Sequence, residues 1–214
     1  IHGGIPAELL QVLDHGRGRG IAGRKIRAHG VQGDLLEPQR NVGIQLPGRN
    51  GRGVDMLNGD GLRVVLWVAG CSHCCKGCQN PVTWDPNGGL EFDDAAKEEI
   101  FDQLSKPYIS GITFSGGDPL HAANRVGVRT LMTEIHEKFP NKTIWLYTGD
   151  VWENVMHDPV MKYVNVLVDG EYVEELRDTK LRWKGSSNQR VIDVQKSLQQ
   201  TDHKTPVLHC GNYA

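Results

Sequence analysis

Arg63–Trp84, RVVLWVAGCSHCCKGCQNPVTW, is the stretch that decides the fold of this chain. Its first seven residues, Arg63–Ala69, are mostly β-branched or aromatic, and the run is too short for an ordinary helix, so it predicts a buried strand. Three cysteines follow with the spacing C-x3-C-x2-C, at Cys71, Cys75 and Cys78. We therefore expect them at the carboxyl end of a strand, where open α/β sheets and barrels place their active sites.

Three thiolates on one short loop can converge on a metal centre. A structural zinc site usually takes four ligands, as two C-x2-C pairs or a pair with two histidines, and the chain has no second pair elsewhere. A [4Fe-4S] cluster held by only three cysteines leaves one iron with free coordination positions. The spacing is the signature of radical S-adenosylmethionine (SAM) enzymes, and zinc or incidental thiols are the alternatives.

Two other residues of the loop are expected to play no part in the metal centre. Cys74 stands beside Cys75, and neighbouring residues of an extended loop point in different directions, so both are not expected to face one cluster. We therefore interpret Cys74 as a bystander. His73 is expected to be an ordinary loop residue, exposed or packed near the cluster.

Composition narrows the class of protein. With 214 residues the chain is long enough for one domain with a sizeable core, or for one domain plus an appendage. A formal charge of −2 gives no global field for nucleic acid or an acidic membrane. The cysteines are clustered in one loop apart from Cys210, which indicates a reducing compartment and no disulfide framework. No apolar run approaches the ~18 residues of a membrane span, so a cytoplasmic protein is expected.

Residues 1–54 differ in composition from the rest. They contain 12 of the 26 glycines, and their basic residues outnumber their acidic ones. Such a segment buries too little apolar surface to offset the entropy of ordering it, so we expect it to be largely disordered. The alternative is a basic Gly-Arg arm for nucleic acid. Met56 lies just ahead of the organised part, which is also consistent with residues 1–54 not belonging to the working protein.

After the cysteine loop, strand and helix patterns alternate, which predicts a parallel sheet with right-handed crossovers. The polar and glycine-rich segments each follow a strand, so they should gather at the same edge of the sheet as the cysteines. The expected strands are 111–115, 143–148 and 164–168. One helix is expected after Asp93-Asp94, with Ala96, Ile100 and Leu104 on its buried face. A second helix is expected over 122–138 and a short one over 152–157.

The segment Ser115-Gly116-Gly117-Asp118-Pro119 is the second informative motif. Its glycines allow a ligand to approach the backbone closely, and its carbonyls and carboxylate can accept hydrogen bonds from an ammonium group. One strand after the cysteine loop, it is interpreted as the site for the SAM amino group; a tight turn capped by Asp118 is the alternative. Thr148-Gly149-Asp150 and Asp169-Gly170 are weaker signals, either turns or contacts to the ribose or methionine carboxylate.

Five stretches, NGDGLRVVLWVAGCSHCCKGCQNPVTW, GITFSGGDPLH, IWLYTG, VNVLVDG and RWKGSSNQR, resemble the activating proteins of anaerobic ribonucleoside-triphosphate reductases. These are glycyl-radical-enzyme activases, and the resemblance covers about residues 55–198. It implies a partial (β/α) barrel, a [4Fe-4S] cluster on Cys71, Cys75 and Cys78, and SAM contacts at Gly77, Cys78, Gln79 and Gly117. Cys74 and Asp150 depart from the family pattern. Residues 1–54 and the tail 199–214 lie outside the resemblance.

The resemblance also implies a reaction. An external donor such as flavodoxin reduces the cluster, SAM is cleaved to methionine and a 5′-deoxyadenosyl radical, and that radical removes a hydrogen atom from a glycine of the partner reductase. No residue needs to act as a general base, so no catalytic side chain is assigned. The alternatives are an activase of another glycyl radical enzyme, such as a formate lyase, and a zinc-stabilised interaction module. The LYTG, NVLVDG and GSSNQR stretches favour the reductase activator.

Overall fold

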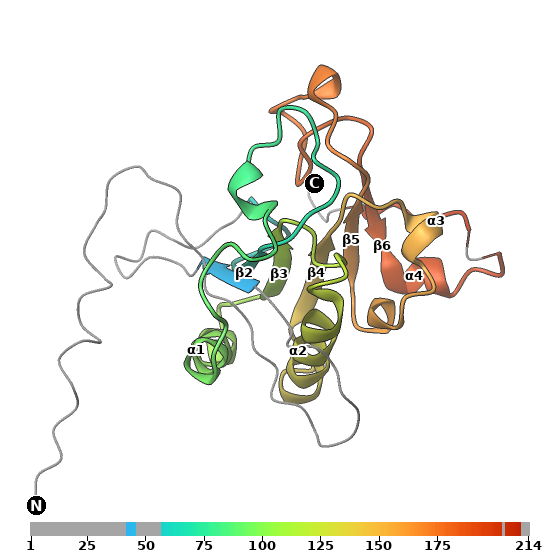
Figure 1. The fold of residues 1–214 in the computed structure, drawn as a ribbon. Helices are drawn as coiled ribbons and strands as arrows, with labels where there is room; N and C mark the ends of the chain where they lie inside the picture. Colours follow the sequence, from blue (N-terminus) through green and yellow to red (C-terminus); the bar gives the residue numbers. More distant parts are fainter. Residues whose placement is uncertain (1–41, 46–56, 203, 211–214) are drawn as a thin grey trace, which may run out of the picture.

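The computed structural model describes residues 42–45, 57–202 and 204–210. Its centre is a six-stranded sheet whose strands lie side by side in chain order (Figure 1). The four inner strands are parallel, and one antiparallel strand pairs at each edge, so the predicted α/β fold with a mostly parallel sheet is confirmed. The strands are β1 (Val42–Gln45), β2 (Arg63–Val68), β3 (Gly111–Gly116), β4 (Thr143–Tyr147), β5 (Val166–Asp169) and β6 (Arg190–Asp193).

Three of the four α-helices form where the sequence predicts helices, and the short α4 (Val194–Leu198) was not predicted. The predicted cap at Asp93 is present, since the Asp93 carboxylate accepts a hydrogen bond from the Ala96 amide at 2.8 Å. The helix that follows buries Ala96, Ile100 and Leu104, as predicted. The α-helices are α1 (Asp94–Ser105), α2 (Arg125–Lys138), α3 (Trp152–Val155) and α4 (Val194–Leu198), and the 3-10 turns are η2 (Pro81–Thr83), η3 (Pro159–Lys162) and η4 (Glu174–Leu176).

The two faces of the sheet are covered differently. On one face, strand residues such as Leu66 and Phe114 pack with apolar residues from all four α-helices in the main core. On the other face a smaller cluster surrounds Trp145, whose ring lies 5.1 Å from that of Trp183 and 5.4 Å from that of His209. Helices therefore cover one face, and loop segments that contain Trp183 and His209 cover the other.

Arg63 stabilises the amino ends of the parallel strands on this second face. It is fully buried, and its guanidinium donates hydrogen bonds to the hydroxyls of Thr113 and Thr143 at 2.9 and 2.8 Å and to three backbone carbonyls. The guanidinium also lies 5.4 Å from the centre of the Trp145 ring. Since Arg63 belongs to β2 and its partners include residues of β3 and β4, one side chain joins three strands at the edge of the sheet opposite the cysteine loop.

Two expectations about strands are corrected. Residues 42–45 form β1, which pairs with β2 and so contradicts the prediction of disorder for those four residues; the rest of 1–54 lies outside the described residues. The glycine-rich composition of the whole segment hides this short run. The sequence also predicts parallel strands throughout, whereas β1 and β6 are antiparallel. Four-residue β6 has one fully buried position, so it gives no clear alternation. The partial (β/α) barrel stays a prediction.

Part of the predicted tail packs on the sheet. The Asp193 amide donates to the Val207 carbonyl and the His209 amide donates to the Val191 carbonyl, each at 2.8 Å. Residues 207–209 therefore extend the edge at β6, while 203 and 211–214 lie outside the described residues.

Candidate functional site

The cysteine loop leaves and re-enters the domain at the carboxyl end of β2. Two main-chain hydrogen bonds close its neck, from the Gly70 amide to the Thr83 carbonyl at 2.7 Å and from the Cys71 amide to the Trp84 carbonyl at 3.1 Å. In Figure 1 this loop and the segment after β5 rise above the same edge of the sheet. The thiols therefore lie at the carboxyl end of a strand, as the sequence predicts. Inside the loop, Gly77 takes a left-handed backbone conformation with φ of 72°.

The five thiols are all free, and they fall into two groups by exposure. Cys71, Cys75 and Cys78 are half-buried, whereas Cys74 and Cys210 are exposed. Burial raises the pKa of the Cys71 and Cys75 thiols above the usual value for cysteine. The exposure of Cys74 agrees with its interpretation as a bystander.

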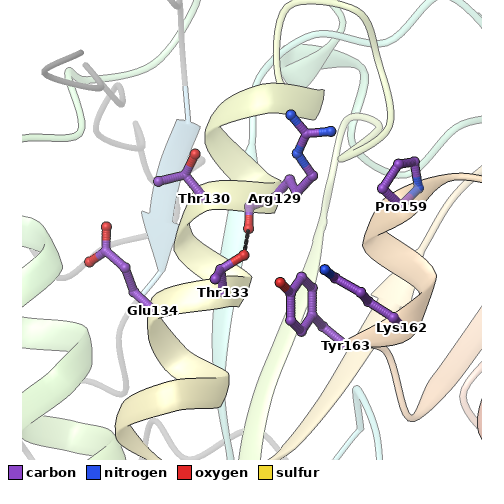
Figure 2. A pocket seen from close by; sticks show the side chains of 7 residues that line it. All are labelled: Arg129, Thr130, Thr133, Glu134, Pro159, Lys162 and Tyr163. Atoms are coloured by element: carbon purple, nitrogen blue, oxygen red, sulfur yellow. Dashed lines mark hydrogen bonds between the residues drawn. The ribbon is translucent and has the colours of Figure 1, made fainter. Parts of the chain in front are cut away.

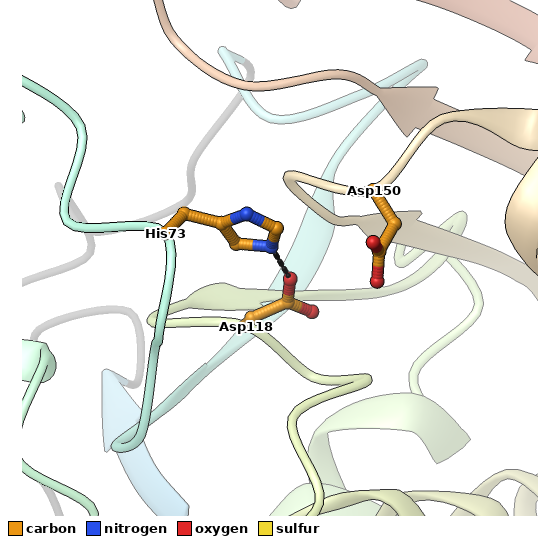
Figure 3. A group of neighbouring side chains, drawn as sticks. All are labelled: His73, Asp118 and Asp150. Atoms are coloured by element: carbon orange, nitrogen blue, oxygen red, sulfur yellow. Dashed lines mark hydrogen bonds and ion pairs between the residues drawn. The ribbon is translucent and has the colours of Figure 1, made fainter.

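The spacing of the thiols in space bears on which metal centre they suit. Among the described residues, the group of three ligand-type side chains whose atoms all lie within 4.8 Å of one another is His73, Asp118 and Asp150, and the three loop sulfurs do not form such a group (Figure 3). A tetrahedral zinc ion with Zn–S bonds of about 2.3 Å would hold its sulfurs about 3.8 Å apart. At least one pair of the three loop sulfurs therefore lies farther apart than the sulfurs of such a zinc site.

The SGGDP motif packs directly on the neck of the cysteine loop. The Gly117 amide donates to the Val68 carbonyl at 2.7 Å and the Asp118 amide donates to the Gly70 carbonyl at 2.8 Å. A Cβ on Gly117 would lie 2.5 Å from the Gly70 carbonyl oxygen and 2.8 Å from that of Thr83. Gly117 therefore allows its turn to lie directly against the backbone of the cysteine loop.

The Asp118 carboxylate is a buried hub. One oxygen accepts hydrogen bonds from His73 Nε2 at 2.8 Å, from the Thr148 hydroxyl at 2.9 Å and from the Gly149 amide at 3.2 Å, and the other accepts from the Leu120 amide at 2.8 Å. Burial opposes ionisation, but these donors outweigh it and hold the pKa of Asp118 below its usual value. The chain's own donors therefore occupy the carboxylate that the sequence assigned to the SAM amino group.

His73 joins this hub to the next strand end. Its Nδ1 lies 3.1 Å from a carboxylate oxygen of Glu171, and its ring covers Gly149 so closely that a Cβ there would lie 2.4 Å from it. The hydrogen bond with Asp118 raises the pKa of His73 to about 9, against the opposing effect of burial and with the help of Glu171. Sequence reasoning missed these contacts because residues 73, 118 and 171 share no local pattern.

A cavity of about 830 Å³ lies beside the cysteine loop on the loop-covered face of the sheet. Of the residues predicted to bind cofactor, Cys78, Gln79 and Ser115 line it. Its other walls include the aromatic side chains of Tyr147 and Trp183. The remaining predicted contacts do not line this cavity; they are Gly77, Gly116, Gly117, Asp118 and Thr148.

The GSSNQR stretch closes one side of this cavity. The side-chain oxygen of Gln189 accepts hydrogen bonds from the Gly185 and Ser186 amides at 2.9 and 3.1 Å, and its nitrogen donates to the Gly170 carbonyl at 3.0 Å. Arg190 forms an ion pair with the buried Asp169. The stretch is therefore a turn fastened to the end of β5, and its Gly185 and Gln189 face the cavity.

Two further hollows lack the cysteines. One of about 590 Å³ adjoins His73 and Asp150 at the ends of β4 and β5. The other, of about 350 Å³, lies on the helical layer between α2 and η3, where the Thr133 hydroxyl bonds the Arg129 carbonyl at 2.9 Å (Figure 2). Neither includes a thiol, so the cavity beside Cys78 is the one that a metal centre on the loop would face.

Residues 57–192 match the protein-family model of a 4Fe-4S single cluster domain. Well over half of the chain is thus a domain of the class that holds one such cluster. Curated relatives named anaerobic ribonucleoside-triphosphate reductase-activating protein come from Enterobacteria phage T4, Escherichia coli K12 and Haemophilus influenzae. The phage T4 protein is 44% identical over 137 residues, which are 64% of this chain and 87% of the relative. The E. coli protein is 43% identical over 142 residues, 64% of this chain and 92% of the relative. The H. influenzae protein is 37% identical over 139 residues, 63% of this chain and 90% of the relative. The chain belongs to this family of activating proteins.

No solved structure matches the chain. Within the part of the chain that the structure describes, every helix is too short or too polar to cross a lipid bilayer.

Proposed function

We propose that this chain is a radical SAM activating enzyme. It would cleave SAM reductively at a [4Fe-4S] cluster and generate the glycyl radical of an anaerobic ribonucleoside-triphosphate reductase. The observation that carries the proposal is the set of three free, half-buried thiols at the end of β2, one of which, Cys78, lines a cavity large enough for a nucleoside-sized ligand. The family match and the named relatives support the same reading.

Cys71, Cys75 and Cys78 are the proposed cluster ligands. When bound, the cluster supplies the electron for SAM cleavage and an open iron site. The loop's closed neck would hold the three half-buried thiols at the carboxyl end of β2, with Cys78 at the cavity.

The proposed SAM contacts are divided between side chains and backbone. Cys78, Gln79 and Ser115 face the cavity. The Asp118 carboxylate is already engaged, so the SGGDP turn would contribute backbone groups to the SAM amino group. Aromatic side chains such as Tyr147 and Trp183 give the cavity an apolar wall. The other proposed contacts are Gly77, Gly116, Gly117 and Thr148.

The proposed partners are the reductase that carries the glycine and a flavodoxin-type electron donor. A cytoplasmic location and a partial (β/α) barrel complete the proposal. Helices on only one face of the sheet support the barrel, because a doubly wound sheet carries helices on both faces.

The test separates this function from its two competitors. The chain is reconstituted with iron and sulfide without oxygen, and iron content and visible absorption are recorded; a colourless protein that retains zinc would indicate an interaction module. The reduced protein is then mixed with SAM and either an anaerobic ribonucleotide reductase or a formate lyase from the same host. A glycyl doublet in the electron paramagnetic resonance spectrum of the reductase sample is expected. A doublet with the lyase alone would reassign the partner.

A further inference from the structure

His73 belongs to the cysteine loop by sequence, yet its side chain contacts the ends of three strands. It bonds Asp118 after β3, covers Gly149 after β4 and bonds Glu171 after β5. Figure 3 shows the imidazole extending from the loop toward the Asp118 carboxylate, with Asp150 beside them. The residue therefore spans the edge of the sheet on which the loop lies.

We propose that His73 is a positioning residue, which fixes the cysteine loop across the ends of β3, β4 and β5 with Asp118 as its anchor. The proposal rests on the function proposed above, because it assigns His73 a task in placing the cluster ligands. Asp118 then acts through His73, and its carboxylate is not a free acceptor for substrate.

The geometry shows why this contact matters more than others of the loop. The side chains of His73 and Asp118 are 15% and 4% exposed, so their ion pair is shielded from solvent. By contrast, the Lys76–Glu175 pair on the same loop is 82% and 64% exposed, and exposed pairs contribute little. Removal of His73 would leave the buried Asp118 carboxylate without one of its hydrogen-bond donors, which is unfavourable.

The position of His73 along the loop adds to the argument. The backbone bonds at Gly70 and Cys71 hold only the neck, whereas His73 lies between the first two proposed cluster ligands, Cys71 and Cys75. A tie at this position restrains both thiols relative to the strand ends. Gly149 permits it, since any side chain there would displace the imidazole.

The test compares His73→Ala, His73→Gln and Asp118→Asn with Ser72→Ala, a change at an exposed neighbour in the same loop. Amide hydrogen exchange is measured on the full chain before and after anaerobic reconstitution. A hydrogen bond to a charged group is worth enough to change local opening about tenfold to a hundredfold. We expect exchange over residues 71–79 to rise by that factor in His73→Ala and less in His73→Gln, with β3, β4 and β5 unchanged. Ser72→Ala should match the unaltered chain.

The midpoint potential of the reconstituted cluster gives a second readout that loss of fold stability alone would not move. It should shift in the same direction in His73→Ala and Asp118→Asn, and their combination should not be additive. Equal exchange and equal potential in His73→Ala and Ser72→Ala would overturn the proposal.

If Asp118→Asn unfolds, the comparison of His73→Ala and His73→Gln with Ser72→Ala decides the matter, because these variants leave Asp118 in place. Equal exchange over residues 71–79 in all three would count against the proposal. Exchange does not depend on SAM cleavage or on a partner, so failure of the proposed function would be distinguishable from failure of this inference.

Discussion

Gly117 lies directly against the carbonyl oxygen of Gly70, where a Cβ would come within 2.5 Å. This contact holds the SGGDP turn on the neck of the cysteine loop. The backbone of Gly117 is not in the left-handed region, so lack of space, and not backbone conformation, excludes a side chain at this position.

Gly117→Ala should therefore weaken the cluster site through the loop. The added methyl must displace the neck, at a cost of about 1–3 kcal/mol typical of overpacking. We expect less bound iron after reconstitution and a lower thermal midpoint. Gly88→Ala is the control, since its nearest atom would be 3.1 Å away. Full iron content in Gly117→Ala would show that the neck can move freely.

The three half-buried cysteines should each be required for the cluster, and the exposed Cys74 should not. Serine removes the thiolate and leaves the shape nearly unchanged, so Cys71→Ser, Cys75→Ser and Cys78→Ser should lose most of their iron and visible absorption. Cys74→Ser is the matched control from the same loop. Loss of the cluster in Cys74→Ser together with its survival in Cys71→Ser would contradict the ligand assignment.

Gln189→Leu should reduce SAM affinity without removing the cluster. The amide side chain makes hydrogen bonds to Gly185, Ser186 and Gly170 that shape the cavity wall, and an isosteric apolar side chain loses them. Loss of these three bonds loosens the cavity wall, and about 1.4 kcal/mol lost from binding would raise the dissociation constant about tenfold. Titration calorimetry of the reconstituted protein measures it, with the exposed Gln199→Ala as control. Unchanged affinity would place SAM away from this wall.

A chain that begins at Met56 should keep the cluster and cleave SAM, because the described site lies within residues 57–202. It lacks β1, so the main-chain groups of β2 that pair with β1 lose their partners. Each kcal/mol lost would lower the thermal midpoint by about 2–4 °C. Light scattering should show more association than for a chain that begins at Arg40. Loss of activity with an intact fold would reveal a role for the omitted residues.

The elements that the sequence predicted correctly are those with local signals. The cap at Asp93, the face that buries Ile100 and the strand that leads to Cys71 each depend on residues close together in the chain. Parallel connections then place the strand ends at one edge, which brought the cysteines beside the SGGDP motif.

The contacts that organise the site could not be predicted in this way. His73 pairs with residues 45 and 98 positions away, and neither periodicity nor spacing encodes which of several acidic residues it meets. Gln189 likewise bonds Gly170, which lies 19 positions away at the end of the neighbouring strand β5. Strands β1 and β6 were missed because each has only two strongly apolar residues, whereas the equally short β5 has three in a row.

The sheet lies between the helical core and the cavity, so changes of sequence on the cavity side need not disturb the core. Residues 177–189, which wall the cavity, lie on the face that the helices do not touch. Under the function proposed above, insertions or substitutions there would alter which partner polypeptide is admitted without repacking the helices. Redesign of partner choice should therefore begin with this wall, and leave the strands and the helical layer as they are.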